Sequence, residues 1–148
     1  PATKMSVYKD GMTFDLGGGK VIEACALAGH TPGSYVFIDK KDSILFSGDA
    51  IIKTFWMWLD NSLPVADYVT NHENILPRFE GLTAIYHGHE REVGKVGIDY
   101  AQTMLTDLKT VLSGEAKCYP CEEEQYSKLA DVYKFDQWEM WVKHTPQE

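Results

Sequence analysis

Three positions in the sequence place a residue of a metal-ligand type directly after a glycine that ends an apolar, strand-like run. The three segments are Ala28-Gly29-His30, Ser47-Gly48-Asp49 and His87-Gly88-His89. Glycine at such a junction allows a tight turn and a close backbone approach, which holds the next side chain at the end of its strand. If these strands are neighbours in one sheet, two imidazoles and a carboxylate converge, and these are ligand types for zinc, iron or manganese. The pattern therefore predicts a metal site formed by His30, Asp49 and His89.

Hydrophobic alternation predicts the strands that must position these residues. Extended segments are expected at 5–8, 12–16, 20–28, 35–39 and 43–47. The first two are expected to form a hairpin through Lys9-Asp10-Gly11, and the last two a hairpin through residues 40–42. Gly17-Gly18-Gly19 is expected to be a break. In 20–28 both sets of alternate residues are apolar, which indicates a strand with both faces buried.

The second part of the sequence favours helices. Apolar residues recur at helical spacing from Val65 to Leu76, with Ser62 as the expected N-cap and Pro64 in the first turn. A short strand is expected at 83–86, followed by a helix over 98–112 that a left-handed Gly114 would end. The tail predicts a helix start at 122–124 and a last strand at 138–142. Without a repeat or a dividing linker, residues 1–148 are expected to form a single domain.

Composition limits the classes of function. The chain has 148 residues and a formal net charge of -8, and no basic cluster of the kind that binds phosphates stands out, so nucleic acid is not an expected partner. The longest apolar runs are far shorter than the roughly 20 residues of a membrane helix, so no membrane association is expected. Three cysteines are an odd number, which favours a reducing compartment over a disulfide framework and predicts a cytoplasmic location.

The segments around the three junctions carry a family resemblance. Gly-His-Thr-Pro-Gly-Ser at 29–34, Leu-Phe-Ser-Gly-Asp-Ala at 45–50 and Tyr-His-Gly-His-Glu at 86–90 resemble the third, fourth and fifth metal motifs of the metallo-β-lactamase-fold hydrolases, in that order. The resemblance covers about residues 5–112. It implies that His30 is a ligand of a first metal, that His89 is a ligand of a second metal, and that Asp49 is the catalytic carboxylate that bridges both. His87 stands where the family commonly has proline and is expected to be a neighbour rather than a ligand.

The same resemblance implies a mixed α/β fold, a four-layer αββα sandwich, of which this chain would supply roughly the C-terminal half. The His-x-His-x-Asp-His motif with which such enzymes open their site is absent. Up to four of the expected ligands are therefore missing, and this chain alone is expected to bind metal poorly and to be inactive. The expected partner is the missing N-terminal half or a second copy of the chain, because a large bare apolar face is not stable in water.

In the complete enzyme, the resemblance implies a pair of zinc ions, with iron or manganese as alternatives. They would lower the pKa of a shared water and present hydroxide to a small-molecule ester, thioester, lactone or phosphodiester. Asp49 would orient that hydroxide. Two alternatives stay open: a redox protein resembling the flavodiiron branch of the fold, and a non-catalytic fragment or scaffold that retains the fold.

Several other residues that could do chemistry are expected to be structural. Cys118 and Cys121 have a C-x-x-C spacing but no second pair, which favours ordinary loop cysteines. The segment 55–58, Phe-Trp-Met-Trp, is expected to be core or an oligomer contact rather than a pocket wall. His72 is expected to be a core histidine, His144 a solvated histidine of the tail, and Cys25 a small buried hydrophobe.

Overall fold

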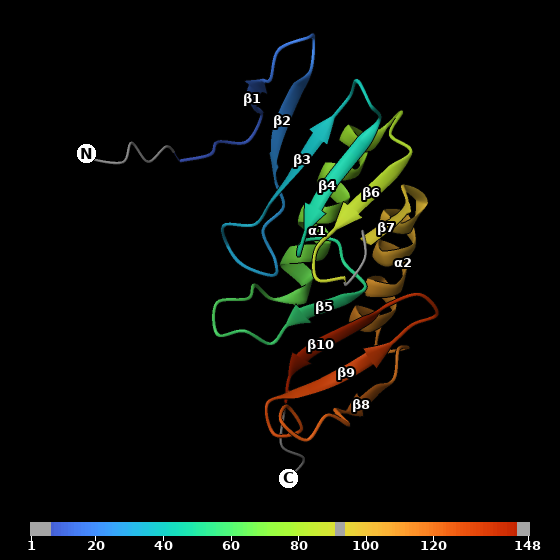
Figure 1. Cartoon of the computed structure of the whole chain (residues 1–148). Coiled ribbons are helices and arrows are strands. Elements are labelled where there is room, and N and C mark those ends of the chain that lie inside the picture. Colours follow the sequence, from blue (N-terminus) through green and yellow to red (C-terminus); the bar gives the residue numbers. More distant parts are fainter. Residues whose placement is uncertain (1–6, 91–93, 145–148) are drawn as a thin grey trace, which may run out of the picture.

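The computed structural model describes residues 7–90 and 94–144, which form a mixed α/β fold with two β-sheets (Figure 1). The larger sheet has the strand order β1-β2-β3-β4-β6-β7. Its strands are β1 (Met12–Asp15), β2 (Val21–Ala26), β3 (Tyr35–Asp39), β4 (Ile44–Gly48), β6 (Ala84–His87) and β7 (Gly94–Gly97). Neighbouring strands are antiparallel except β4 and β6, which are parallel.

The smaller sheet has the order β5-β10-β9-β8 and joins a segment from the middle of the chain to its end. Its strands are β5 (Thr54–Met57), β10 (Glu139–Lys143), β9 (Ala130–Lys134) and β8 (Cys118–Pro120). β5 and β10 are parallel, and the other two pairs are antiparallel. The smaller sheet therefore fixes β5, which follows the Asp49 segment, against the C-terminal part of the fold.

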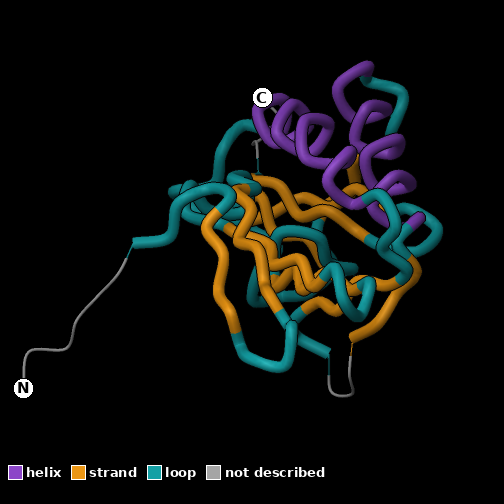
Figure 2. The backbone as a smooth tube through the Cα atoms, turned by 90° about the horizontal axis from the view of Figure 1, so that it is seen from above, coloured by secondary structure: helices purple, strands orange, loops and turns teal. Residues whose placement is uncertain are grey.

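Helices α1 (Val65–Ile75) and α2 (Asp99–Ser113) pack against one side of the strands, as the view from above shows (Figure 2). A short 3-10 helix, η1 (Leu76–Phe79), continues α1. Gly114 ends α2 with a φ of 77°, the left-handed C-cap that the sequence predicts. In the described part of the chain, none of the helices has the length and apolar character that crossing a membrane requires.

The main core lies between the larger sheet and the helices. Alternate residues of its strands point to this side and are fully buried: Cys25, Val36, Ile38, Leu45 and Ile85. They share one cluster with buried residues of α1, α2, β5 and β10, such as Tyr68, Met104, Phe55 and Met140. Because side chains alternate along a strand, the remaining residues of each strand point away from the helices.

That opposite face of the larger sheet carries a row of partly exposed aromatic side chains. Phe37 pairs with Phe46 across β3 and β4, and Phe46 pairs with Tyr86 across β4 and β6. Phe46 is 42% exposed, and its ring lies 5.8 Å from that of Tyr86. Tyr8 packs edge-on against Phe14 and Phe37 at the β1 end of the same face. We call the row Phe37, Phe46 and Tyr86 the aromatic face.

Most predicted elements are confirmed. The second hairpin is β3 and β4, both helices lie at the predicted positions, and the strands predicted at 83–86 and 138–142 are β6 and β10 with shifts of one residue. In β2 the adjacent Ala24 and Cys25 are both fully buried, so both faces of this strand are covered at its centre.

The first predicted hairpin is wrong in its partner. Residues 7–9 form no strand, and residues 5 and 6 of that prediction lie outside the described residues. β1 pairs instead with β2 through the Gly17-Gly18-Gly19 segment, where Lys20 N donates to Gly17 O at 3.0 Å. All three glycines have a positive φ, which glycine adopts at no steric cost because it has no Cβ. The predicted turn at Gly11 does not form a hairpin, because Gly11 N donates to Ala24 O and so places residues 10–11 alongside β2.

Two smaller predictions are also wrong. Ser62 does not cap α1, because Pro64 occupies the N-cap position and no side chain of the described residues caps the helix. The acidic run 122–124 starts no helix; it leads into turns that end at β9. The helix preference of this acidic run is overridden by tertiary packing. Tyr126, just after the run, packs its ring against Trp56, Trp58 and Trp141.

His72 predicts a specific acid sensitivity of the fold. The side chain is fully buried, neither ring nitrogen has a hydrogen-bond partner among the described residues, and burial lowers its pKa to about 4. Between pH 6.5 and pH 4, His72 binds a proton in the unfolded chain but stays neutral in the folded chain. The unfolding free energy therefore falls as the pH drops from 6.5 toward 4. We expect this group to remove about 2 kcal/mol of unfolding free energy between about pH 7 and pH 4.5.

Urea unfolding of the wild type and of His72→Leu at these two pH values checks the expectation. The variant should lose less stability on acidification than the wild type does. His144→Gln is the matched control, since His144 is only partly buried and pairs with Asp131. Equal acid losses in the wild type and His72→Leu would contradict the assignment.

Candidate functional site

Three strands of the larger sheet bring the predicted ligand residues to one edge. β2 is antiparallel to β3, β3 is antiparallel to β4, and β4 is parallel to β6. Consequently β2, β4 and β6 all run in the same direction, and their C-terminal ends lie at the same edge of the sheet. His30, Asp49 and His89 follow these three ends, as the Gly-ligand junctions predict.

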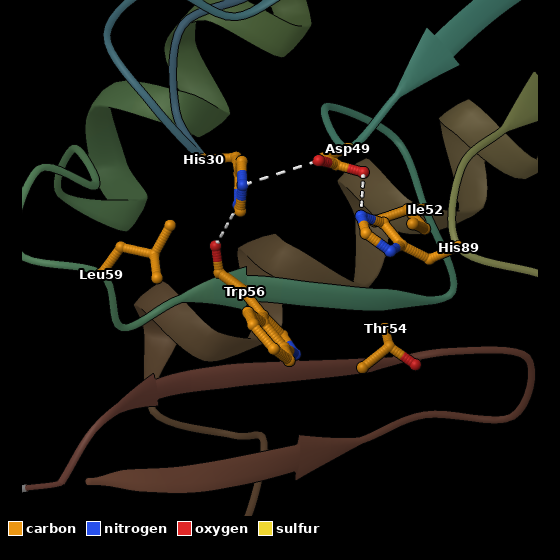
Figure 3. A pocket seen from close by; sticks show the side chains of 7 residues that line it. All are labelled: His30, Asp49, Ile52, Thr54, Trp56, Leu59 and His89. Atoms are coloured by element: carbon orange, nitrogen blue, oxygen red, sulfur yellow. Dashed lines mark hydrogen bonds and ion pairs between the residues drawn. The ribbon is translucent and has the colours of Figure 1, made fainter.

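The carboxylate of Asp49 lies between the two imidazoles (Figure 3). Asp49 Oδ1 is 3.1 Å from His89 Nε2, and Asp49 Oδ2 is 3.8 Å from His30 Nε2. Each oxygen of one carboxylate thus faces a different ring. The surroundings of the two rings differ, because the side chain of His30 is 15% exposed and that of His89 is 78% exposed.

The backbone of residues 28–30 is held at its three consecutive carbonyls. Ser62 Oγ donates to His30 O at 2.9 Å, Leu63 N donates to Gly29 O at 2.8 Å, and Asn71 Nδ2 donates to Ala28 O at 3.0 Å. All three donors come from α1 and the connection that leads into it. The hydroxyl that the sequence assigns to a helix cap therefore positions the candidate ligand loop instead.

The ring of His30 is oriented by a fourth contact. His30 Nδ1 lies 2.7 Å from the carbonyl oxygen of Trp56. A carbonyl only accepts, so Nδ1 carries the hydrogen, and in the neutral ring Nε2 keeps its lone pair. That lone pair is on the side of Asp49. This contact gives Nε2 of His30 the state that a metal ligand needs.

The segment after Asp49 is held in the same way, by hydroxyl groups. The carbonyls of Ala50, Ile51 and Ile52 accept from the hydroxyls of Tyr68, Ser47 and Tyr100, respectively. Burial raises the pKa of the Tyr68 and Tyr100 phenols well above the ordinary value, so both remain protonated donors. The two helices thereby fix the backbone that carries Asp49.

Tyr68 contacts both ligand loops. Its hydroxyl binds the residue after Asp49, and its ring lies against Gly29, the residue before His30. A Cβ at Gly29 would lie 2.2 Å from Cδ2 of Tyr68, so only glycine fits there. Gly48 is required for a different reason, since its φ of 53° is in the left-handed region. His89 also has a left-handed φ, 61°, which is uncommon for a residue with a Cβ.

The donor types fit zinc, but their number does not complete a site. Zinc is bound by imidazole nitrogens and carboxylate oxygens, with three or four protein ligands. Across residues 7–90 and 94–144, no group of three or more His, Cys, Asp or Glu side chains is arranged so that it could hold a metal ion. The three residues are therefore a partial ligand set, with Asp49 and His89 in direct contact with each other.

A pocket of about 370 Å³ opens beside the trio (Figure 3). Besides the trio, its lining comes from β5 and the segments that flank it: Ile52, Thr54, Trp56 and Leu59. The prediction for 55–58 holds for Phe55 and Met57, which are buried in the main core. It is wrong for Trp56, which lines the pocket and also packs against Trp58, Tyr126 and Trp141.

The other candidate residues are not part of the trio. His72 is a core residue of α1, as predicted. His87 pairs with Gly48 across β4 and β6 and is therefore a neighbour of the site, as predicted; it is 9% exposed, with Nδ1 3.1 Å from Gly88 O. The solvated position predicted for His144 is wrong, because its ring pairs with Asp131 at 2.9 Å. The three thiols are free: Cys25 is buried, which raises its pKa to about 11, while Cys118 lies in β8 and Cys121 is buried just after it.

Sequence reasoning missed the roles at this site of Ser62, Asn71, Tyr68 and Tyr100. Their roles depend on contacts between helices and backbone carbonyls. Tyr68 and Asn71 lie three residues apart in α1, a spacing that places side chains on neighbouring parts of a helix face, but the sequence does not say which loop that face meets.

The structure thus combines two sheets, helices on one side, and a His-Asp-His cluster at the ends of strands that run in the same direction. The profile of the metallo-beta-lactamase superfamily matches residues 3–103. The chain belongs to the metallo-beta-lactamase superfamily.

Solved structures of this superfamily share the fold at low identity. A family protein from Thermus thermophilus is 18% identical with a TM-score of 0.57, covering 72% of this chain and 36% of that one. A metallo-beta-lactamase from Pontibacter korlensis is 18% identical with a TM-score of 0.53, covering 69% of this chain and 47% of that one. DIM-1 metallo-beta-lactamase, in a structure of the protein exposed to ceftazidime, is 20% identical with a TM-score of 0.52, covering 67% of this chain and 45% of that one.

The alignments thus span less than half the length of these solved proteins. Among curated proteins, none matches the sequence.

The Ser62 contact predicts a measurable effect on the ligand loop. Ser62→Ala removes the hydroxyl that holds His30 O, so we expect the unfolding free energy to fall by about 1 kcal/mol. We also expect shifted and broadened NMR signals from the His30 ring. Ser62→Thr, which keeps a hydroxyl, should restore both.

Ser127→Ala is the matched control, because the Ser127 hydroxyl donates to Glu124 O in an exposed turn far along the chain. Its effect on the His30 signals should be nil. If Ser62→Ala leaves those signals unchanged, the hydroxyl does not position His30.

Proposed function

We propose that this chain is part of a metal-dependent hydrolase, to whose metal centre it contributes His30, Asp49 and His89. The observation that carries the proposal is the position of Asp49, whose two oxygens face separate imidazoles at the edge where β2, β4 and β6 end. The substrate class is a small-molecule ester, thioester, lactone or phosphodiester. Superfamily membership supports the reaction class, and the geometry supports the residues.

Two zinc ions, or iron or manganese in their place, would supply water activation and polarisation of the scissile bond when bound. Asp49 would bind both ions, because one of its oxygens faces each imidazole. His30 would bind through Nε2, since Nδ1 donates to Trp56 O. His89, highly exposed and in contact with Asp49, would bind on the other side.

We propose further that another polypeptide segment completes both the ligand set and the fold. If two metals share these three residues, each metal has only one or two protein ligands from this chain. Zinc sites use three or four protein ligands. The aromatic face of the larger sheet is only partly covered by this chain. An N-terminal half of the domain, or else a second copy of the chain, would cover that face, give a four-layer αββα sandwich and add ligands. The chain on its own would then be inactive.

The partial ligand set also favours a second candidate, a non-catalytic scaffold that keeps the fold. This alternative rests on the lack of a closed metal-binding group among the described residues. The two candidates differ in what they require of His30 and Asp49: the hydrolase needs their donor atoms, whereas the scaffold needs only their loops.

Zinc titration of the chain by calorimetry tests the hydrolase proposal. We expect weak binding that Asp49→Asn and His30→Ala each weaken at least about tenfold, because first-sphere donors contribute no less than the outer partners that orient them. His144→Ala should not change the affinity, since His144 lies apart from the site. Zinc binding that is equal in all four proteins would favour the scaffold.

Sedimentation velocity tests the covering of the aromatic face. The isolated chain should self-associate with rising concentration, because partly exposed aromatic side chains on one sheet face gain from burial. Phe46→Lys should shift the chain toward monomer. Leu112→Lys, at a similarly exposed apolar residue on α2, is the matched control and should not. A wild type that stays monomeric throughout would reject a second copy as the cover of the aromatic face and leave the N-terminal half.

A further inference from the structure

We infer that the pocket beside His30, Asp49 and His89 receives an uncharged, apolar group of the substrate, such as the acyl or alkyl part of an ester or thioester. The inference adds to the proposed function and rests on it, because the occupant of the pocket is a substrate only if the chain is part of a hydrolase. It narrows the substrate class to compounds that carry an apolar group next to the scissile bond.

The first argument is the composition of the wall. Besides the trio, the pocket is lined by Ile52, Thr54, Trp56 and Leu59, of which three are apolar. Figure 3 shows Trp56 and Thr54 below the two imidazoles, Leu59 on the side of His30, and Ile52 beside His89. A volume of about 370 Å³ is at the lower end of the range for ligand pockets. A short apolar chain buried against such a wall gains free energy with each methylene.

The second argument is charge. The described residues that line the pocket include no Lys or Arg, and Asp49 brings a negative charge. The nearby cation Lys53 is not part of the lining, and its ammonium lies 3.9 Å from Glu90 Oε1. Anionic groups are normally recognised by Arg or Lys in charge-assisted hydrogen bonds. In the chain without metal, an anion here would meet a carboxylate and apolar side chains instead.

The third argument is that the wall is preformed. Ile52 is 4% exposed and belongs to the main core, and its carbonyl is held by Tyr100. The Trp56 ring lies 5.3 to 5.9 Å from the rings of Trp58, Tyr126 and Trp141. Because these residues are already ordered, binding an apolar group costs little conformational entropy at the wall.

The test is an NMR titration of the full chain, without metal, with primary alcohols from ethanol to hexanol and with inorganic phosphate. We expect the Ile52 and Leu59 methyl signals and the Trp56 indole signal to respond to the alcohols. Affinity should rise about three- to fourfold per methylene until the pocket is filled. Phosphate should leave these signals unchanged.

Leu59→Ala shortens the wall and should flatten the dependence on chain length. Leu129→Ala, at an exposed leucine in the turn before β9, is the matched control and should keep it. Binding of phosphate at these signals in preference to the alcohols, or an affinity that does not change with chain length, would overturn the inference. Because the alcohol titration uses no metal, its result does not depend on the result of the zinc titration. A chain that binds no zinc but keeps the dependence on alcohol chain length would reject the proposed hydrolase and leave the apolar pocket.

Discussion

The common direction of β2, β4 and β6 is the constraint on which the site depends. A strand that ran the other way would carry its following residue to the opposite edge of the sheet, roughly the length of a strand from the others. The antiparallel β3 between β2 and β4 solves this for the first pair with short connections. The parallel pairing of β4 with β6 requires a crossover, which β5 and α1 provide. The crossover that makes the pairing possible is also the segment that holds His30.

Side-chain and backbone donors to main-chain carbonyls then convert this rough placement into a defined geometry. Six carbonyls, three in each of the loops that carry His30 and Asp49, accept hydrogen bonds from residues of the crossover, the helices or β4. A buried carbonyl without a partner costs free energy, so each loop is stable only where its donors are present. His89 differs, since its side chain is mostly exposed.

The sequence predicts that His30, Asp49 and His89 come together at one edge of the sheet, because the signal is local. Each Gly-ligand junction is visible in three residues, and the alternation of apolar residues before it indicates a strand. The sequence also predicts both helices and the β3–β4 hairpin, whose turn and periodicity are local too.

What the sequence does not predict depends on distant partners. Ser62 has the type and position of an N-cap, and only its contact with His30 O shows another role. The Gly17-Gly18-Gly19 segment is a hairpin turn rather than a break, because β1 pairs with β2 and not with the partner that the Asp-Gly signal indicates. Trp56 belongs to an aromatic cluster and to the pocket wall at once, which no pattern in 55–58 reveals.

Tyr68 has a consequence for how His30 and Asp49 move together. One phenol spans the gap between the loops, with its ring against Gly29 and its hydroxyl on Ala50 O. A single side chain on α1 therefore links the two loops that carry His30 and Asp49. Sliding or rotating that helix would displace both residues in concert, whereas lengthening the surface connections around them would leave their spacing unchanged.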